Sequence, residues 1–594
     1  MSAPGPTVGV RAASRTTPTD GRYRWIALTN TTMAVFMSSL DGSIVLISLP
    51  AIFTGIKLDP LAPANIVYLL WMIMGYRLVQ SVLVVAVGKF GDIFGRVRVY
   101  NLGFLVFTAA SVLLSFDPMH GARAAMWLIG WRLLQAFGGS MLTANSGAIL
   151  TDAFPRERRG FALGINQVAG LAGMFIGLTA GGVLAAWDWR SVFWVNVPVG
   201  IVGTLWAYFM LRDNGVRHPA RIDWWGNATF AAGLSAVLIA ITFGLQPYGT
   251  HAMGWTDPWV DGGLILGVFL LAAFVVIERR VVDPMFELRL FTIRAFAFGN
   301  ATRFAGSLAQ GGLQFVLVIW LQGIWLPLHG YSYASTPLWA GILMLPLTCG
   351  FLVAGPISGA LSDRLGARAF ATTGMLVFGL SFVGLILLPV DFVYWQFAAL
   401  LALNGIGMGM YSAPNSAAIM SSVPARYRGV ASGMRATFQN SGSSLSIGVF
   451  FSLMIAGLAG SLPQSLTAGL AAHGVPHDIA AQIGALPPVS SLFAAMLGVN
   501  PIQHLLSQFH ALGALPTAAQ EALTGHAFFP HLIAGPFHDG TVVVFTVSAV
   551  IAAVAAATSA LRGTGAAPVE GTAPTTDIAL SDTPPIPATS KEHA

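Results

Sequence analysis

The sequence has very little charge and almost no cysteine for its length. Asp, Glu, Lys and Arg make up 9% of the 594 residues, whereas 55% are hydrophobic and the mean hydropathy is +0.71. This balance excludes a water-soluble globular domain of this size and indicates an integral membrane protein. The single cysteine, Cys349, excludes an intrachain disulfide and lies inside an apolar run, where we expect a packing role.

Signals for several other protein classes are missing as well. The sequence has no G-x-x-x-x-G-K-[ST] motif, which argues against an ATP-driven pump. The apolar runs contain no metal-ligand cluster, nucleophile elbow or paired carboxylates, so we expect no enzymatic activity, cofactor or metal. The net charge of +6 is explained by membrane topology and by contact with anionic lipid, so we expect no nucleic-acid binding.

What the sequence does contain is about fourteen apolar runs, each long enough to cross a bilayer as a helix. Placing the N-terminus in the cytoplasm puts most of the 30 Lys and Arg residues inside, whereas Lys57, Arg123 and Arg190 fall outside. By the positive-inside rule, this asymmetry predicts an even number of spans with both termini cytoplasmic. The segment before the first run lacks an apolar core and a cleavage site, so it is interpreted as a tail and not as a signal peptide.

The chain also contains an internal repeat. Residues 138–164 and 407–433 align without gaps, and residues 88–96 and 359–368 share the pattern G-x-x-x-D-x-x-G. Chance similarity between Gly- and Ala-rich helices is the alternative, but the ungapped register favours duplication into two six-helix halves, an architecture that secondary transporters use. The predicted division is a cytoplasmic tail (1–24), a first half (25–211), two inserted helices with linkers (212–290), a second half (291–562) that includes a long extracellular loop (461–540), and a disordered cytoplasmic tail (563–594).

Four motifs resemble those of the major facilitator superfamily, and within it the fourteen-helix drug:proton antiporters. They are LDGSIVLISLPAI in the first span, GKFGDIFGRVRVY after the second, WRLLQAFGGS in the fourth and DWRSVFWVNVPVG before the sixth. The resemblance implies an all-α major facilitator fold of two six-helix repeats plus two inserted helices. It places Asp41, Arg132 and Gln135 on motif positions, together with Gly88, Asp92, Gly95 and Arg96.

One motif departs from the family pattern. In the fifth span, GLTAGG has Leu178 where the antiporters have proline, which weakens the inference of export. Gly173, Gly177 and Gly181 still recur every fourth residue, next to Gly182. We therefore expect a bare helix face on which a neighbouring helix packs tightly.

Asp41 is the only acidic residue deep in a predicted span, and no histidine lies in one. A carboxylate at such a depth costs roughly 2.5 to 3.5 kcal/mol on insertion scales, so it indicates a function. By elimination, Asp41 is the candidate proton carrier. The alternative is a structural ion pair with an arginine, and both Arg77 and Arg132 lie at a compatible depth.

Two further polar stripes cross the second half. Arg303, Ser307, Gln310 and Gln314 share one face of the ninth span, and Arg435 and Gln439 repeat the pattern in the thirteenth. We expect them to line a substrate cavity, and a buried interhelical hydrogen-bond network is the alternative. Because four arginines face one aspartate in the membrane, the cavity should disfavour dications and accept neutral, zwitterionic or anionic amphiphiles.

The repeated loops between spans are interpreted as cytoplasmic latches that hold an outward-facing state. A carboxylate at a helix end can clamp neighbouring helix termini or arginines. An ordinary solvated turn is the alternative. The predicted latch residues are Gly88, Asp92, Gly95 and Arg96, and in the second half Asp363 and Gly366.

The 461–540 segment contains His473, His477, His504, His510, His526, His531 and His538 but neither Lys nor Arg. Its periodicity predicts short helices that lie on the outer membrane surface or cap the exit. Metal binding or pH sensing is a less favoured reading, because Gly474 and Pro476 separate the one close histidine pair.

Together these features predict a monomeric plasma-membrane transporter that exports hydrophobic or amphiphilic small molecules in exchange for protons, in contact with membrane lipid. The predicted mechanism is alternating access between the two halves. A lipid or lipid-precursor translocator on the same fold is the main alternative. A membrane-embedded enzyme or receptor is a third reading, for which the sequence offers no site.

Overall fold

The structure is a computed structural model. It describes residues 21–58, 65–155, 158–213, 223–246, 248–249, 251, 253–281, 284–333, 335–424, 427–485, 487–497 and 500–563. The predicted tails lie outside these ranges, except that the first helix already begins at Gly21 and Gly563 is described. Throughout the described part the chain is helical, apart from an isolated bridge between Tyr248 and His251.

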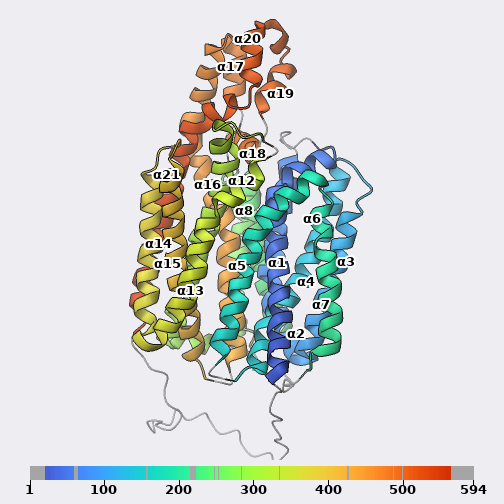
Figure 1. Cartoon of the computed structure of the whole chain (residues 1–594), viewed down its shortest axis with the longest axis vertical. Helices are drawn as coiled ribbons and strands as arrows, with labels where there is room; N and C mark the ends of the chain where they lie inside the picture. The colour runs from blue at the N-terminus through green and yellow to red at the C-terminus, as the bar shows by residue number, and fades with distance from the viewer. Residues whose placement is uncertain are drawn as a thin grey trace, which may run out of the picture.

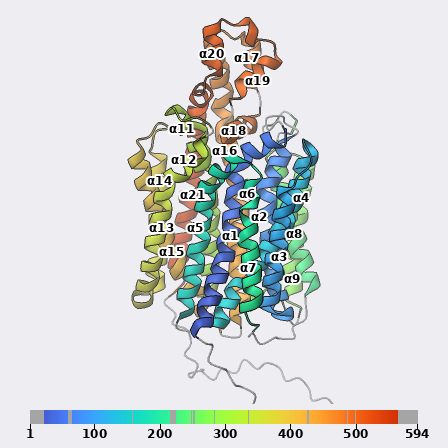
Figure 2. The same cartoon turned by 45° about the vertical axis from the view of Figure 1, so that its right-hand side comes forward.

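The first half and the insert follow one another along the chain as long apolar helices. The first half comprises α1 (Gly21–Gly55), α2 (Ile66–Phe94), α3 (Arg96–Ser115), α4 (Ala122–Ala153), α5 (Arg159–Trp187), α6 (Ser191–Trp194) and α7 (Asn196–Met210). The insert comprises α8 (Trp224–Gly244) and α9 (Pro258–Glu278). The two inserted helices pack on each other at the side of the bundle, and α8 also contacts α2 and α16 (Figure 2).

The second half is longer and less regular. It comprises η3 (Leu288–Thr292), α10 (Arg294–Ile319), the π-helical η4 (Trp320–Trp325), α11 (Leu326–Leu328), α12 (Thr336–Leu343), α13 (Leu345–Leu365), α14 (Ala367–Ile386), α15 (Tyr394–Ser421), α16 (Arg428–Ala472) and α21 (Phe528–Ala560). Between α16 and α21 lie α17 (His477–Gly484), α18 (Pro488–Leu497), α19 (Pro501–Gln508), η6 (Leu512–Ala514) and α20 (Thr517–Thr524).

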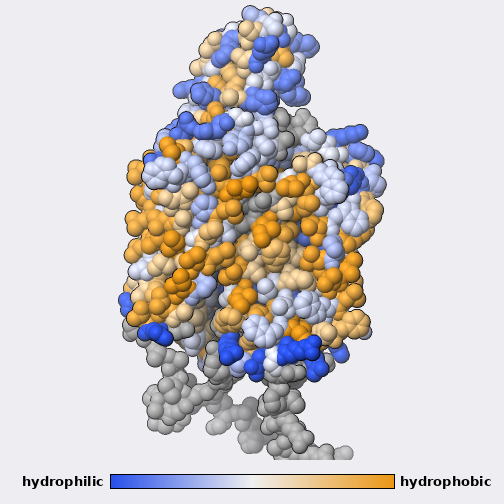
Figure 3. Space-filling view, viewed as in Figure 1, coloured by the Kyte–Doolittle hydropathy of each residue, from blue (hydrophilic) through white to orange (hydrophobic). Residues whose placement is uncertain are grey.

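Within the described ranges, eleven helical units are long and apolar enough to cross a membrane. Three further long helices, α4, α5 and α15, have 32, 29 and 28 residues and pack among them, which brings the total to the expected fourteen. Apolar side chains cover the middle of the body, whereas hydrophilic ones gather at its two ends (Figure 3). This distribution is that of a multi-pass membrane protein whose helix bundle faces lipid.

The predicted extracellular loop is shorter than its sequence indicated, and it is raised above the bundle. α16 does not stop near residue 458 but continues to Ala472, and α21 begins at Phe528. The two helices stay paired beyond the bundle, where Ser461 Oγ donates to Asp539 Oδ2 at 2.9 Å. The predicted short helices are present, but α17, α19 and α20 stand on this extended pair above the body (Figure 1). They therefore do not lie along the level of the membrane surface.

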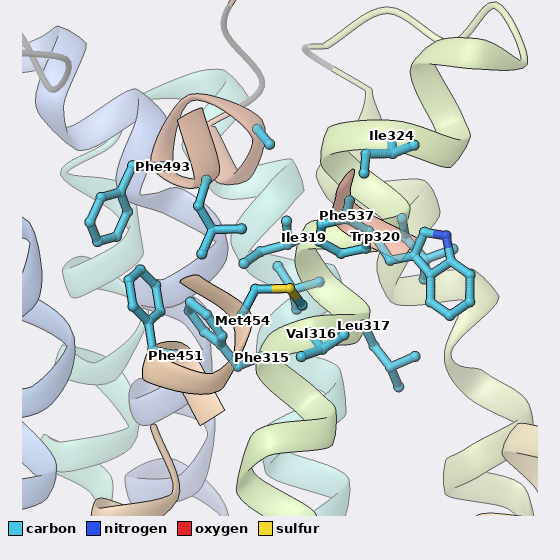
Figure 4. Packing of buried hydrophobic residues seen from close by; sticks show 14 of the residues in the cluster. Phe315, Val316, Leu317, Ile319, Trp320, Ile324, Phe451, Met454, Phe493 and Phe537 are labelled. Atoms are coloured by element: carbon cyan, nitrogen blue, oxygen red, sulfur yellow. The ribbon is translucent and has the colours of Figure 1, made fainter. Parts of the chain in front are cut away.

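α18 lies lower than the other loop helices and closes over the upper end of the bundle. The rings of Phe493 on α18 and Phe451 on α16 are 5.1 Å apart. A Cβ at Gly323 in η4 would lie 2.6 Å from the Ala495 carbonyl oxygen of α18, so the two backbones are in contact. The fully buried Trp320 packs near Phe537 of α21 in the same cluster (Figure 4). Aromatic packing thus joins α10, α16, α18 and α21 at this end.

The glycine stripe of α5 lies directly against α1. A Cβ at Gly177 would come within 2.5 Å of the Leu40 carbonyl oxygen, and one at Gly181 within 2.8 Å of the Ile44 carbonyl oxygen. Gly173 meets the Phe36 carbonyl oxygen even more closely. Every fourth residue of α5 therefore has to be glycine for the two backbones to touch. Gly182 points elsewhere, toward Leu338 of α12 in the second half.

Replacing Gly177 by alanine should force α1 and α5 apart. The added Cβ meets backbone that cannot rotate away, and overpacking of this kind costs about 1–3 kcal/mol. We expect a lower melting temperature for purified Gly177→Ala in detergent. Gly164→Ala, in the same helix with open space around its Cβ position, is the matched control and should melt no lower than wild type. Equal melting of both variants with wild type would show that the contact is not tight.

Candidate functional site

Asp41 lies at the centre of a fully buried polar cluster in the first half. Its carboxylate has 0% exposure and forms an ion pair with Arg132, whose Nη1 is 2.5 Å from Oδ2. Asn196 Nδ2 and Gln135 Nε2 donate to Oδ1 at 2.7 and 3.0 Å. Gln135 Oε1 in turn accepts from Arg132 Nη1 at 2.8 Å. Helices α1, α4 and α7 are thus joined at one carboxylate.

Two neighbouring helices complete this cluster. Gln135 also donates to Ser111 Oγ on α3 at 2.9 Å. On α2, the ring of Tyr76 lies under the guanidinium of Arg132, with 4.4 Å between Cζ and the ring centroid. The Tyr76 hydroxyl is 3.2 Å from Ser38 Oγ of α1. Because the aromatic face attracts a cation, Tyr76 helps to hold Arg132 in place when the carboxylate changes.

Chemically, the Asp41 carboxylate of this cluster can pair with either of two cations, the guanidinium of Arg132 or a proton. Removing one partner of a buried ion pair leaves an uncompensated charge in low dielectric, which costs several kcal/mol. Protonation of Asp41 removes the negative charge and with it the attraction that fixes Arg132. The structure shows the ion pair with an arginine, which was the alternative reading of the sequence. The role of Asp41 as proton carrier stays a prediction.

Sequence reasoning did not single out Asn196, Ser111 or Tyr76. Asn196 stands within the quoted stretch DWRSVFWVNVPVG, and an amide inside an otherwise apolar run was a usable signal. Ser111 and Tyr76 carry no such signal, because serines and tyrosines are common in spans. Only their rotation toward Asp41 makes them part of the site.

Arg77 is placed away from Asp41. It lines a small cavity of about 10 Å³ between α2, α8 and α16, with Met74, Thr242 and Ser444. The Arg77 carbonyl oxygen accepts a hydrogen bond from Ser444 Oγ of α16 at 3.3 Å. One turn further along α2, the hydroxyl of Ser81 is 2.6 Å from the same Ser444 hydroxyl. Arg77 therefore belongs to the contact between the two halves and the insert, and not to the carboxylate.

The polar stripe of α10 is divided between two environments. Arg303 is 2% exposed and donates to Ser412 Oγ at 2.9 Å and to Gln439 Oε1 at 2.5 Å. It therefore belongs to a buried interhelical hydrogen-bond network, which was the alternative to a cavity wall. Ser307 is buried where α10 meets Gly442 of α16. Gln314 donates to Met174 Sδ of α5 at 3.2 Å, across the interface between the halves.

Three atoms of this second-half set are left without a hydrogen-bond partner among the residues that the structure describes. They are Arg303 Nε, Gln310 Oε1 and Arg435 Nη1. The stripe thus runs from the buried network around Arg303 to the interface between the halves at Gln314, and its role as a cavity wall stays a prediction.

The repeated loops adopt the same turn in both halves. Gly95 (φ +105°) links α2 to α3, and Gly366 (φ +91°) links α13 to α14, so each occupies a backbone conformation that favours glycine. The side chain of Asp363 lies outside the described set. Gly88 and its counterpart Gly359 each face an alanine, Ala144 at 3.8 Å and Ala413 at 3.6 Å. The duplication seen in the sequence is thus repeated in three dimensions.

Arg96 lies at the centre of the first predicted latch. Its Nε donates to Asp92 Oδ1 at 2.8 Å, and its Nη1 contacts both oxygens of Asp152 at 2.8 and 2.7 Å. These contacts tie the ends of α2, α3 and α4 together within the first half. At the same end, the Cβ position of Gly147 on α4 is 3.9 Å from Ser432 Oγ on α16, where the two halves meet.

The paired bundles, the repeated turns and a charged centre buried in one half define a secondary transporter. The chain belongs to the Major Facilitator Superfamily, whose family model matches residues 31–308 and 289–447. This is a family of transporters and not of enzymes. The fold is also that of a bacterial homolog of the human lysosomal transporter Spinster, solved in inward-facing form. The TM-score is 0.52 at 16% identity, over 91% of this chain and 98% of that one.

Several curated relatives are similar over most of their length. The riboflavin transporter RibZ of Clostridioides difficile is 30% identical over 73% of this chain and 88% of its own. The methyl viologen resistance protein SmvA of Salmonella typhimurium is 30% identical over 76% of this chain and 86% of its own. The tetracenomycin C resistance and export protein of Streptomyces glaucescens is 27% identical over 79% and 84%.

The partnership of Asp41 with Arg132 can be tested by a double-mutant cycle. Arg132→Gln should lower the free energy of unfolding by about 3–5 kcal/mol, because it leaves a buried carboxylate without its cation. Adding Asp41→Asn should recover part of that loss. Thermal melting of the four proteins gives the coupling.

The matched control cycle pairs Asp41→Asn with Arg77→Gln. Because Arg77 lies in a different contact, the two effects should add. Coupling of Asp41 to Arg77 as strong as to Arg132 would contradict the arrangement described here.

Proposed function

We propose that this protein exports small hydrophobic or amphiphilic molecules in exchange for protons, as a member of the fourteen-helix drug:proton antiporters. The observation that carries the proposal is the buried ion pair of Asp41 and Arg132, surrounded by Asn196 and Gln135. A buried carboxylate held only by an arginine and two amides can exchange its cation for a proton. No second carboxylate faces it in the described helices of the first half.

In the proposed cycle, protonation of Asp41 from outside releases Arg132, which the Tyr76 ring retains nearby. Arg132 then loses the charged acceptor that joined α4 to α1, and the hydrogen bond from Asn196 of α7 weakens because its acceptor is no longer charged. Because these helices belong to one half, the release changes that half's packing and favours the opposite orientation of the two halves. Deprotonation on the inner side restores the ion pair as substrate is exchanged.

By the positive-inside rule, the proposed orientation has the end of the bundle that carries Arg96 in the cytoplasm, and the plasma membrane is the proposed site of action. The helices α17–α20 then stand outside, and α18 covers the outer end. The lipid-translocator alternative loses support, because it relied on loop helices lying at the membrane surface.

The relatives support a small-molecule substrate but differ in the compound that their names give. They name riboflavin, methyl viologen and tetracenomycin C. The charges inside the bundle indicate which class of small molecule suits this chain. Arg132 is neutralised by Asp41, whereas Arg77, Arg303 and Arg435 have no carboxylate partner among the described residues. Neutral or anionic molecules therefore suit this interior better than dications.

Proton coupling can be tested in proteoliposomes with riboflavin, fluorescein and rhodamine 6G as candidate substrates. An imposed gradient of one pH unit supplies about 1.4 kcal/mol, enough for about tenfold accumulation per proton. We expect wild type to accumulate at least one of these dyes and Asp41→Asn to lose the accumulation.

Exchange of the dye at equal pH on both sides should persist in Asp41→Asn, which shows that the variant is folded. Gradient-driven accumulation by Asp41→Asn at the wild-type level would exclude Asp41 as the proton carrier.

The latch can be tested with a reporter cysteine at the inner contact between the halves. Ser432→Cys in a Cys349→Ser background is shielded when α4 and α16 are in contact. Arg96→Gln removes the charge pairs that hold α2, α3 and α4 together, so it should raise the rate of labelling by an impermeant maleimide from the cytoplasmic side several-fold. Arg98→Gln, two residues away and exposed, is the control and should label as the parent does. Equal rates in all three would show that Arg96 is an ordinary surface ion pair.

A further inference from the structure

Three arginines of the second half lie near one buried tyrosine, Tyr411 of α15, and none of them has an acidic partner among the described residues. Arg303 comes from α10, Arg435 from α16, and Arg562 follows the end of α21. Arg303 donates to Ser412 Oγ, next to Tyr411. Arg562 Nη2 lies beside Gly299, whose carbonyl oxygen accepts from the same Asn415 amide that donates to Tyr411. The sequence placed Arg562 in the cytoplasm, but its side chain is 4% exposed.

Each of the three guanidinium groups has at least one buried nitrogen that donates no hydrogen bond within the described residues. Arg303 uses its two Nη atoms on the neutral groups of Ser412 and Gln439, and its Nε has no partner. Arg435 Nη1 is buried and unpartnered. Arg562 has no partner for Nε, Nη1 or Nη2 within the described ranges. Five buried N–H-bearing nitrogens of these three arginines therefore have no acceptor among the described residues.

The Tyr411 hydroxyl adds a further donor to this region. The residue is fully buried, and its oxygen accepts a hydrogen bond from Asn415 Nδ2 at 3.2 Å. The hydroxyl proton is then free to point at an incoming acceptor. Gly299 of α10 packs closely on this region, because a Cβ there would lie 2.6 Å from Ile419 Cγ1 and 3.4 Å from Arg562 Nη2.

Two arginines of the first half have carboxylate partners of a kind that the three arginines of the second half lack among the described residues. There, Arg132 pairs with Asp41, and Arg96 pairs with Asp92 and Asp152. In the second half, no carboxylate of the described chain lies within salt-bridge distance of the three arginines. Burying a guanidinium without a counter-charge is costly, and the cost is repaid only by an anion that also satisfies its hydrogen bonds.

We propose that Arg303, Arg435 and Arg562, together with Tyr411, form a binding site for an oxyanion carried by an amphiphilic molecule. Guanidinium groups bind carboxylate, sulfonate and phosphate through paired, charge-assisted hydrogen bonds. Arg303 is nine residues into α10, about 14 Å from the end of the helix at a rise of 1.5 Å per residue. The site therefore lies in the half of the bilayer that faces the cytoplasm in the proposed orientation.

This inference rests on the proposed function and adds a substrate class to it. The proton site belongs to the first half and the anion site to the second, so proton and substrate act on different halves of the molecule. The same oxyanion chemistry has two sources: the head of an anionic substrate, or the phosphate of an anionic lipid entering near Arg562.

Binding to the full-length protein in detergent tests the site without any gradient. The probes are fluorescein, which carries a carboxylate, and rhodamine 6G, a cation on the same ring system. Fluorescein should bind wild type, and Arg435→Gln should weaken it about tenfold, as expected for one charge-assisted hydrogen bond. Arg435→Lys should retain part of the affinity because it keeps the charge.

The matched control is Arg368→Gln, an exposed arginine at the same end of the second half. It should leave the fluorescein affinity unchanged, and rhodamine 6G binding should not weaken in any variant. Retained fluorescein binding by Asp41→Asn separates this site from proton coupling. If wild type binds fluorescein but shows no gradient-driven transport, the result counts against the proposed function and leaves the anion site standing.

Phosphatidylglycerol added to the micelles distinguishes the two sources, with phosphatidylcholine as the neutral comparison. If a lipid phosphate fills the site, phosphatidylglycerol displaces fluorescein and Arg562→Gln relieves that competition. If the substrate anion fills it, phosphatidylglycerol has no more effect than phosphatidylcholine. The proposal is overturned if neither fluorescein nor phosphatidylglycerol binds more weakly to Arg435→Gln and Arg562→Gln than to wild type.

Discussion

A carboxylate can remain charged inside a helix bundle only if a cation and several donors surround it, and Asp41 meets this requirement with Arg132, Asn196 and Gln135. In low dielectric the pair is strong while intact and costly to break. That constraint fixes the rotation of α1, α4 and α7 about their own axes, because each must present one polar side chain at the same point. The surrounding apolar packing is compatible with many rotations, whereas this contact is compatible with one.

Close backbone contact between α5 and α1 in the first half also supports the position of Asp41. Gly173, Gly177 and Gly181 bring α5 against the turns of α1 on either side of Asp41. Dispersion and interhelical contact drive association in lipid, where apolar burial gives little. A helix held this tightly cannot follow a change at Asp41 alone, so in the proposed cycle the first half would move as one body. The Leu178 departure from the antiporter motif leaves these three contacts in place.

The two halves share a fold but not a charge pattern. The repeated turns at Gly95 and Gly366 and the matched contacts of Gly88 and Gly359 preserve the duplication at the ends of the helices. In the interior it has been lost: the counterpart of Arg132 is Leu401, and the second half has arginines where the first has an ion pair. A symmetrical scaffold with an asymmetrical interior is what an exchanger of two unlike species needs.

The sequence by itself determined the membrane class, the duplicated halves and the sole deep acid, because hydropathy, repeat register and depth along a helix are all linear properties of the chain. Arg77 and Arg132 have the same depth, so only the tertiary structure could decide between them: the rotation of α4 turns Arg132 toward Asp41, while Arg77 on α2 faces α8 and α16. The same limit applies to α16, whose continuation past Pro463 to Ala472 depends on its contact with α21 and not on its own hydropathy. Depth follows from counting residues at a fixed rise, but the direction in which a side chain points between helices is set by the neighbours that pack around it.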